Sequence, residues 1–408
     1  MVDLLDADTS DCPYAAYDEL RSEAPVWHDP RTGMWVITRY VDVRSILVDT
    51  ERFTSARHRG RVDPRSAKLR AIYQARGWIP APTLNGRDDP EHREMRAMFN
   101  VAFRPGKVTE LEPFIERLAH RLLGDLIGVG QGDWVRSFAI PLPLIVIGHQ
   151  VGVPEGDIWQ IKAWTDAWVQ RLGMMQNEEE AVWSTEQEIE AQHYFQPIFE
   201  RLRREPDDTL LSDLVNTVIP EWGRTLTDEE LHAEMMADTF VGGSETTTNA
   251  IAEGVRLLIE HPLAWDQVCA DPDTYVPRLV EEVLRLESPV QGLFRSTVVD
   301  VEMHGTVIPA GSVINIRFGS ANRDAEQFER PAEFDLDRSN MKSHIAFGFG
   351  THHCLGAPLA RRELTISFRA LAERVERMWF IDGANDFRHH PNFVLRALRE
   401  LHIGVAPR

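Results

Sequence analysis

The chain has 408 residues, of which 43% are hydrophobic, which is typical of a globular protein with enough interior to enclose a cofactor. Aspartate and glutamate number 64 against 44 for lysine and arginine, and this net charge of −20 argues against nonspecific nucleic-acid binding. The cysteines, Cys12, Cys269 and Cys354, are too few for a disulfide framework and fit a reducing cytoplasm.

The first elements predict a small mixed region without a membrane anchor. Residues 1–8 lack the basic and apolar segments of a signal peptide or anchor, so we expect a bacterial-type protein that does not bind membranes. Residues 13–24 predict a short amphipathic helix and residues 26–38 a hairpin with Asp-Pro and Gly in its turn. A helix is expected over residues 41–48.

Residues 55–88 are expected to form a long connection with room for one short helix. Basic residues gather here against a single acid, Asp63, although the protein is acidic overall. These residues are Arg57, Arg59, Arg61, Arg65, Lys68, Arg70 and Arg76. The simpler interpretation is a basic loop exposed to solvent. The functional interpretation is that one of these residues steers or pairs with an anionic substrate.

A helix is predicted to follow, with Asp89 as its N-cap and Pro90 at its first position. His92 and Arg96 are four residues apart, share one face of this helix and would suit a pair of carboxylates. An isolated pair with this spacing is about as often an ordinary surface feature as a binding site. Further helices are expected over residues 111–126, 158–172 and 178–199, with an apolar, proline-broken stretch at 141–153 and a polar loop at 203–208.

A capping box of Thr227 and Glu230 begins a predicted helix that runs to about Glu260, roughly 50 Å at 1.5 Å per residue. Its apolar residues lie on several sides, so we expect it to be buried. Gly242 and Gly243 at its centre would each cost about 1 kcal/mol relative to alanine. Such a cost indicates close approach of a flat ligand, a local opening of the helix or a packing notch.

The region after this helix predicts an ion pair and a small sheet. Glu282 and Arg285 lie one helical turn apart, a spacing that on the surface contributes little. Residues 295–316 alternate β-branched side chains around a turn at Pro309-Ala310-Gly311 and therefore predict strands.

The most informative stretch is residues 347–356, FGFGTHHCLG. It delivers Cys354 to the start of a predicted helix, with Pro358 in the first turn and an apolar stripe from Leu359 to Val375. Free N–H groups at a helix start favour a thiolate. The glycines allow backbone to approach something large and flat.

A lone cysteine has simpler interpretations, of which a buried apolar thiol is the commonest. A zinc site does not fit, because there is no C-x-x-C and His352, His353 and Cys354 are consecutive. A cysteine protease would need a distant oriented histidine, which the sequence leaves open.

The whole string matches F-G-x-G-x-H-x-C-x-G and so resembles the haem-binding loop of the cytochrome P450 family. H-x-x-x-R from His92, G-G-x-E-T from Gly242 and E-x-x-R from Glu282 occur in that family's order. The resemblance covers essentially residues 1–408. It implies one mainly α-helical haem domain with small antiparallel β-sheets (α+β) and no fused reductase.

The resemblance also implies roles for individual residues. Cys354 becomes the proximal iron ligand of a b-type haem, and Glu245 and Thr246 the acid and alcohol that deliver protons to reduced oxygen. Many relatives have aspartate where this chain has Glu245. The residues expected at the haem are His92, Arg96, Gly242, Gly243, Arg295, Phe347, Gly348, His352 and Gly356. Glu282, Arg285 and Arg338 are expected to form a buried structural cluster.

The substrate is expected to meet a mostly apolar pocket. Its predicted lining residues are Trp78, Ile79, Trp168, Leu172, Val290, Leu293, Phe294 and Phe393. A terpene, steroid, fatty acid or aromatic compound would fit such a pocket, and the basic residues 57–76 tilt the expectation slightly toward an acid.

The implied activity is that of a haem-thiolate monooxygenase, which inserts one atom of O2 into a small-to-medium apolar substrate by hydroxylation or O-dealkylation. Electrons are expected from a separate ferredoxin and its reductase, and the protein is expected to be a monomer. Candidate docking charges are Arg93, Arg104, Lys107, Arg361 and Arg362, although scattered surface charge explains each equally well.

Two other functions remain open at this point. One is a haem-thiolate enzyme that does not insert oxygen from O2, such as a peroxygenase, dehydratase or coupling enzyme. The other is a non-catalytic haem binder or gas sensor. The presence of both Glu245 and Thr246 favours oxygen use over either alternative.

Overall fold

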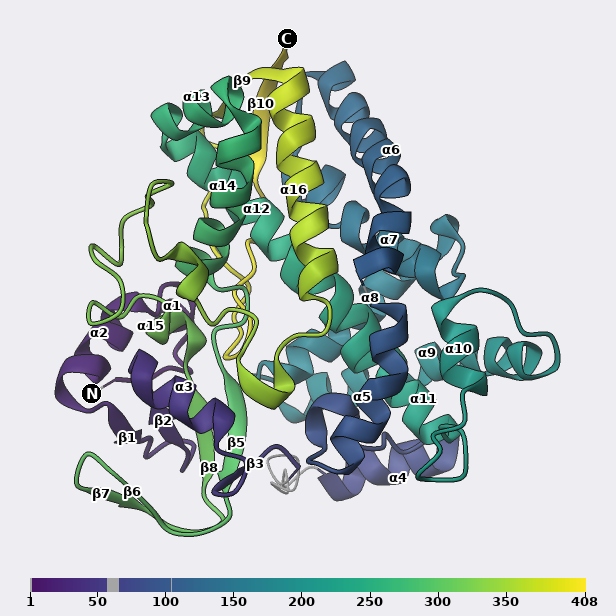
Figure 1. Cartoon of the computed structure of the whole chain (residues 1–408). Coiled ribbons are helices and arrows are strands. Elements are labelled where there is room, and N and C mark those ends of the chain that lie inside the picture. Colours follow the sequence, from purple (N-terminus) through teal and green to yellow (C-terminus); the bar gives the residue numbers. More distant parts are fainter. Residues whose placement is uncertain (1, 57–65, 104) are drawn as a thin grey trace.

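A long helical run over residues 228–260 crosses the middle of the molecule (Figure 1). The structure is a computed structural model that describes residues 2–56, 66–103 and 105–408. The run consists of α11 (Asp228–Glu234), the π-helical segment η5 (Met235–Glu245) and α12 (Thr246–Glu260). The predicted capping box at Thr227 and Glu230 is present. The predicted local opening is also present, because the glycine pair lies inside the π-helical segment.

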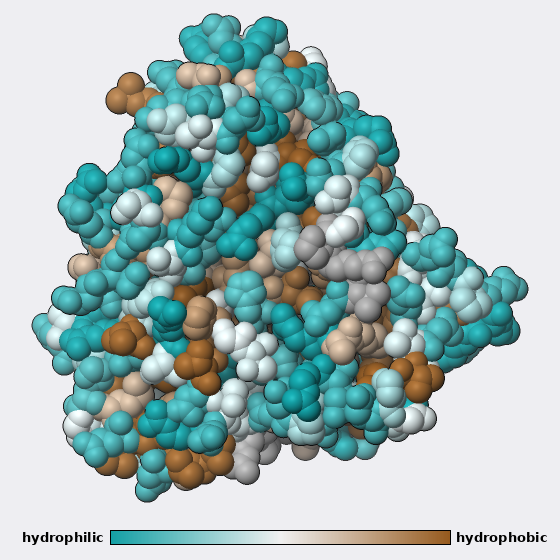
Figure 2. Space-filling view, viewed as in Figure 1, coloured by the Kyte–Doolittle hydropathy of each residue, from teal (hydrophilic) through white to brown (hydrophobic). Residues whose placement is uncertain are grey.

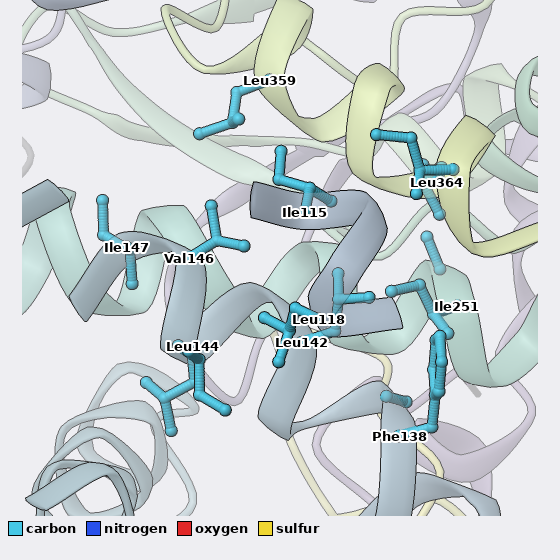
Figure 3. Close-up of a cluster of buried hydrophobic side chains, with 14 of the residues drawn as sticks. Ile115, Leu118, Phe138, Leu142, Leu144, Val146, Ile147, Ile251, Leu359 and Leu364 are labelled. Atoms are coloured by element: carbon cyan, nitrogen blue, oxygen red, sulfur yellow. The ribbon is translucent and has the colours of Figure 1, made fainter. Parts of the chain in front are cut away.

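Three helices enclose this central run. They are α6 (Pro105–Val129), α7 (Pro141–Val151) and α16 (Ala357–Arg374), and α16 stands beside α6 in Figure 1. Figure 3 shows apolar side chains that these helices, α12 and the segment before α7 bury against one another: Ile115, Leu118, Phe138, Leu142, Leu144, Val146, Ile147, Ile251, Leu359 and Leu364. Burial of this apolar surface is the main force that holds the central helix in place.

The other helices surround this core. They are α1 (Ala7–Asp11), α2 (Tyr14–Glu23), α3 (Tyr40–Val48), α4 (Ser66–Arg76), α5 (Glu91–Ala102), α8 (Ile158–Leu172), α9 (Glu178–Arg204), α10 (Leu210–Asn216), α13 (Pro262–Ala270), α14 (Pro272–Glu287) and α15 (Phe318–Ala321).

Several expected boundaries differ from the structure. The helix predicted from Asp89 begins at Glu91, and the Asp89 carboxylate instead accepts a hydrogen bond from the N–H of Arg93. The stretch predicted as a loop at residues 203–208 begins inside α9, which continues to Arg204. The proline-broken stretch at 141–153 is largely the helix α7, because Pro141 stands in its first turn, where no backbone donor is needed.

The strands form three small sheets. The largest has the order β1–β2–β8–β5–β3, and the predicted hairpin supplies its first two strands. Its strands are β1 (Val26–His28), β2 (Trp35–Ile37), β3 (Phe53–Thr54), β5 (Leu293–Thr297) and β8 (Val313–Ile316). The second sheet, β4–β10–β9, joins β4 (Gln131–Asp133), β9 (Val375–Phe380) and β10 (His402–Pro407). The third pairs β6 (Val301–Met303) with β7 (Thr306–Ile308).

Hydrophilic residues cover most of the face seen in Figure 2, with hydrophobic residues scattered between them. Within the described ranges, we find no helix with the length and apolar character needed to cross a membrane. The fold is therefore mainly α-helical with small sheets, as the sequence predicts, but the largest sheet is not purely antiparallel, because β2 and β8 run parallel.

Candidate active site

Cys354 lies in a tight loop that ends where α16 begins. The N–H of Cys354 donates to the carbonyl of Phe347 over 2.8 Å and closes the loop. Gly350 has a φ of +73°, and a Cβ at this position would lie 2.7 Å from the carbonyl oxygen of Leu47 in α3. Glycine is required here because the loop both turns left-handed and lies directly against another helix.

The environment of the Cys354 thiol combines opposing effects. Burial raises the pKa of the thiol, whereas the N–H groups of Gly356 and Ala357 and the charge of Arg96 lower it. The helix N-terminus thus favours the thiolate as expected, but burial outweighs it and the pKa lies above its ordinary value. A metal cation at the sulfur would supply the remaining stabilisation of the anion.

A cavity of about 860 Å³ adjoins Cys354. Most of its lining is apolar, which is the usual character of a site for small organic molecules. Of the residues predicted for haem, oxygen or substrate, it is lined by Gly242, Gly243, Thr246, Trp168, Leu172, Val290, Leu293, Phe294, Arg295, Phe347, Gly348, His352, Cys354 and Gly356.

Hydrogen-bond donors gather at one part of this site. The rings of His92 and His352 lie 4.1 Å apart between centroids, and Arg96 donates to the carbonyl of His353 over 2.7 Å. Nε2 of His92 is buried and has no hydrogen-bond partner among the described residues. Burial lowers the pKa of Arg295 to about 10, although Asp88 opposes the shift. Buried donors of this kind suit carboxylate groups of a ligand.

The central helix brings Thr246 to the cavity but turns Glu245 away from it. The hydroxyl of Thr246 donates to the carbonyl of Gly242 over 3.4 Å. Glu245 is buried and is not among the described residues that line the cavity. Its carboxylate accepts hydrogen bonds from Lys162, at 3.1 Å, and from the hydroxyl of Thr165, at 3.0 Å.

The two glycines of the π-helical segment have different surroundings. A Cβ on Gly243 would lie 3.2 Å from Cγ1 of Ile147 in α7, so Gly243 also serves as the packing notch that was one of its predicted roles. A Cβ on Gly242 would meet no side chain within 4 Å, only the carbonyl oxygen of Ala237 at 3.6 Å.

Known proteins share this arrangement. The sequence profile of the family described as Cytochrome P450 matches residues 179–376. The Vitamin D(3) 25-hydroxylase of Pseudonocardia autotrophica is 34% identical over 97% of this chain and 94% of its own length. This chain belongs to the cytochrome P450 family.

Solved cytochrome P450 structures superpose on nearly the whole chain. The cytochrome P450 CREJ in complex with (4-ethylphenyl) dihydrogen phosphate has a TM-score of 0.88 at 31% identity and covers 97% of both chains. CYP109E1 from Bacillus megaterium in complex with testosterone has a TM-score of 0.79 at 33% identity and covers 96% of this chain and 99% of its own. The protein is therefore a cytochrome P450 monooxygenase, a class that uses an organic substrate, O2 and a redox partner.

Cytochromes P450 bind haem b through a cysteine thiolate, and the residues of this cavity fit that group. Cys354 lies at the cavity wall, beside N–H groups that stabilise a thiolate, and would supply the sulfur ligand. Arg295 lines the cavity, whereas His92 and Arg96 are not among the described lining residues and lie behind it, with His92 against His352. The buried donors of Arg295 and His92 would suit the propionates. Gly242 lines the cavity and a Cβ there would meet no side chain, so the wall at this position has room for a flat ring.

The structure brings the three residues of the expected structural cluster together. Arg285 donates to both oxygens of Glu282, at 2.7 and 2.8 Å, and Nε of Arg338 lies 3.1 Å from the same carboxylate. Glu282 and Arg285 are fully buried. Both arginines also bind backbone carbonyls before the cysteine loop, so the cluster fixes the segment that leads to Cys354.

Three residues predicted for the substrate pocket lie elsewhere. Trp78 and Ile79 are not among the described lining residues, although the next two, Pro80 and Ala81, are. Trp78 packs against the rings of His193 and His232. Phe393 is buried under the guanidinium of Arg317, 3.8 Å from its ring centroid, whereas its neighbours 394 and 395 line the cavity.

Several residues at the site were not predicted from the sequence. Lys162 and Thr165 of α8 hold Glu245, and Arg171 and Glu188 line the cavity. Glu363 of α16 also lines it, is fully buried, and has no hydrogen bond to either carboxylate oxygen among the described residues; burial raises its pKa well above the ordinary value. The sequence does contain a signal for Glu363, because it is a glutamate inside the apolar stripe of α16.

The basic residues 57–76 only partly fall within the described chain, since Arg57, Arg59, Arg61 and Arg65 lie outside it. In α4, Lys68 pairs with Glu178 at 2.5 Å and Arg76 with Glu186 at 2.6 Å, and all four side chains are exposed.

Most of the predicted docking charges are also paired. Arg361 binds Glu281, Arg362 binds Glu112, and Lys107 binds Glu110. Arg93 is exposed, and Arg104 lies outside the described residues.

Proposed function

We propose that this cytochrome P450 hydroxylates or O-dealkylates a small-to-medium apolar organic compound. The observation that carries the proposal is the cavity, which is mostly apolar and has Cys354 and Thr246 in its walls. A substrate in this cavity loses its apolar contact with water, so the cavity selects hydrophobic molecules that fill it.

The proposed roles of the site residues follow from their positions. Cys354 holds the haem iron, and His92, Arg96, Arg295 and His352 bind its propionates. The haem, when bound and reduced, supplies the activation of O2. Thr246 then offers a hydroxyl at the cavity wall to hold a proton. Glu245 relays protons from its partner Lys162, whose side chain is 13% exposed, toward that hydroxyl.

The names of relatives support a neutral polycyclic substrate as one member of this class. One relative is called a vitamin D3 hydroxylase, and CYP109E1 structures contain testosterone or corticosterone. Other neighbours contain an aryl phosphate or a fatty acid ligated to an acyl carrier protein. The shared feature of these ligands is an apolar part, which agrees with the lining of this cavity.

Electrons are proposed to come from a separate ferredoxin that docks near the cysteine loop, with the protein acting as a single-domain monomer. Arg93 is exposed on α5, the helix that also carries His92 and Arg96. An acidic ferredoxin would gain from positive charge at this surface, although the net charge of the chain opposes its approach.

The reduced carbon monoxide spectrum and a ferric titration test this function on one sample. We expect a thiolate-type carbon monoxide band and a low-to-high-spin shift with neutral apolar compounds of graded size. Absence of the band would contradict the role of Cys354. Turnover with peroxide but not with O2 and a reduced ferredoxin would instead identify a peroxygenase.

A further inference from the structure

Three polar side chains, of which Tyr73 and Glu188 are buried and Arg171 is partly exposed, form a cluster on the wall of the cavity, where α4, α8 and α9 meet. The hydroxyl of Tyr73 donates to Glu188 over 2.6 Å, and Nη1 of Arg171 donates to the Tyr73 oxygen over 2.6 Å. Nη2 of Arg171 also pairs directly with Glu188. The three residues lie far apart in the sequence, and α4 lies close to α9 at the lower right of Figure 1.

The charges of this cluster cancel. Glu188 is 2% exposed and carries the negative charge that balances Arg171. Burial lowers the pKa of Arg171, but Glu188 and Tyr73 outweigh burial and raise it, so the guanidinium stays charged. The cluster is thus a neutral unit with a strongly polar surface.

Arg171 presents part of this surface to the cavity. Its side chain is 27% exposed, carries its guanidinium 5.9 Å from the ring centroid of Trp168, and is one of the lining residues. Within the described ranges, its Nε donates no hydrogen bond. A guanidinium has more N–H donors than the contacts with Tyr73 and Glu188 use. Donors are therefore available to a molecule in the cavity.

The hydroxyl of Tyr73 is already committed as donor and acceptor, so the cluster offers N–H groups. A neutral carbonyl or ether oxygen can accept from them without disturbing the charge balance. A carboxylate would add a second negative charge close to Glu188, in a poorly solvated site where like charges repel strongly.

We propose that Arg171, held by Glu188 and Tyr73, recognises a neutral hydrogen-bond acceptor on an otherwise apolar substrate. This inference rests on the proposed function and narrows its substrate class to ketones, lactones and ethers over carboxylic acids. It differs from the slight leaning toward acids that the basic residues 57–76 suggested. Of these residues, Lys68 and Arg76 are paired with glutamates of α9, whereas Arg57, Arg59, Arg61 and Arg65 lie outside the described residues.

The test uses the haem-loaded protein and matched ligands of two sizes: decalone, decalin and decalincarboxylate, and the corresponding steroid ketone, hydrocarbon and carboxylate. Affinity is measured by ferric difference spectra and by displacement of imidazole from the iron, and folding by thermal unfolding. The variants are Glu188→Gln, the neutral pair Arg171→Met with Glu188→Gln, and Lys68→Met as a control on α4 that leaves the cluster intact.

We expect the neutral pair variant to lower the ketone-to-hydrocarbon affinity ratio about tenfold, because a hydrogen bond from a charged donor is lost. Glu188→Gln leaves Arg171 without its counter-charge and should raise carboxylate affinity about tenfold while ketone affinity changes little. Lys68→Met should leave all ratios unchanged.

A ketone-to-hydrocarbon ratio that stays constant in the neutral pair variant overturns the proposal, since a purely structural cluster would affect all ligands alike. Wild-type protein that binds carboxylates as tightly as ketones also overturns it. These outcomes are distinct from failure of the proposed function, which would appear as a missing thiolate-type carbon monoxide band in the wild type.

Discussion

Lys162 of α8 and Glu245 of the central helix form an ion pair, with Nζ 3.1 and 3.3 Å from the two carboxylate oxygens. Both side chains are largely buried, at 13% and 8% exposure. The acid predicted to deliver protons is thus tied to a neighbouring helix and not to Thr246, its neighbour in the chain. Movement of this carboxylate toward the cavity requires that it leave Lys162 and Thr165.

Removal of Lys162 should therefore affect both stability and coupling. Lys162→Met leaves Glu245 buried without a cation and should lower the free energy of unfolding by about 3 kcal/mol. Product formed per O2 consumed should fall, with more hydrogen peroxide released. Urea unfolding and peroxide assays measure the two effects.

The double variant Lys162→Met with Glu245→Gln is the control for that prediction. It removes the charges of Lys162 and Glu245 and leaves Asp166, the other partner of Lys162, whose side chain is 49% exposed and can be solvated. It should therefore recover most of the lost stability but not the coupling. Recovery of coupling as well would contradict a role for Glu245 in proton delivery.

Acid should weaken the support of the cysteine loop through Glu281. Burial raises the pKa of this carboxyl, but hydrogen bonds from His344 and Arg361 outweigh burial and lower it to about 2. Because the folded pKa is depressed from 4.5, the stabilisation is complete above pH 4.5 and is lost as the pH falls toward 2. Between pH 5 and 3, wild type should lose about 2 kcal/mol more than Glu281→Gln, measured by urea unfolding at each pH. Parallel losses in both proteins would refute this assignment.

A comparison of two glycines with positive φ separates two effects of an added side chain at the cysteine loop. One effect is backbone strain, and the other is a clash with the backbone of α3. Gly33 and Gly350 have φ of +68° and +73°, but a Cβ on Gly33 meets nothing within 4 Å, whereas one on Gly350 meets the carbonyl of Leu47 at 2.7 Å. Gly33→Ala should cost about 1 kcal/mol from strain alone. Gly350→Ala should cost at least about 2 kcal/mol and reduce haem content, as measured by thermal unfolding and Soret absorbance. Equal costs would show that α3 does not constrain the loop.

Arg295 should matter more for holding haem than for folding. Its guanidinium is 7% exposed and its pKa is lowered to about 10 by burial, so a propionate would relieve an unfavourable environment. Arg295→Met should release haem to apomyoglobin about tenfold faster, because a charge-assisted hydrogen bond is lost. Arg204→Met, at the exposed end of α9, is the matched control and should leave the rate unchanged. An unchanged rate in Arg295→Met would exclude a propionate contact.

The parts of the site that depend on local spacing could be predicted from the sequence. The cysteine loop, the capping box at Thr227 and the turn that joins Glu282 to Arg285 are fixed by residues within a few positions of one another. The helix types also followed from periodicity, because these helices bury one apolar face. The end of α9 was missed because a run of polar residues is compatible with a last exposed helical turn.

The parts that depend on distant residues could not be predicted. Lys162 and Glu245 are 83 positions apart, and Tyr73 and Glu188 are 115 apart. Nothing in the surrounding residues distinguishes these charges from the many surface pairs of this protein. Trp78 and Phe393 were misplaced for the same reason, since which side of a segment faces the cavity is decided by packing against other helices.

The wall of the cavity is assembled from both ends of the chain. Met34 and Leu395 both line it. Leu395 is held in place through the preceding residue, Val394, whose carbonyl accepts a hydrogen bond from the N–H of Gln291. During synthesis, the wall of the pocket therefore stays incomplete until Leu395 has left the ribosome. A chain that ended before residue 390 would have a complete cysteine loop, but its cavity wall would lack residues 394 and 395.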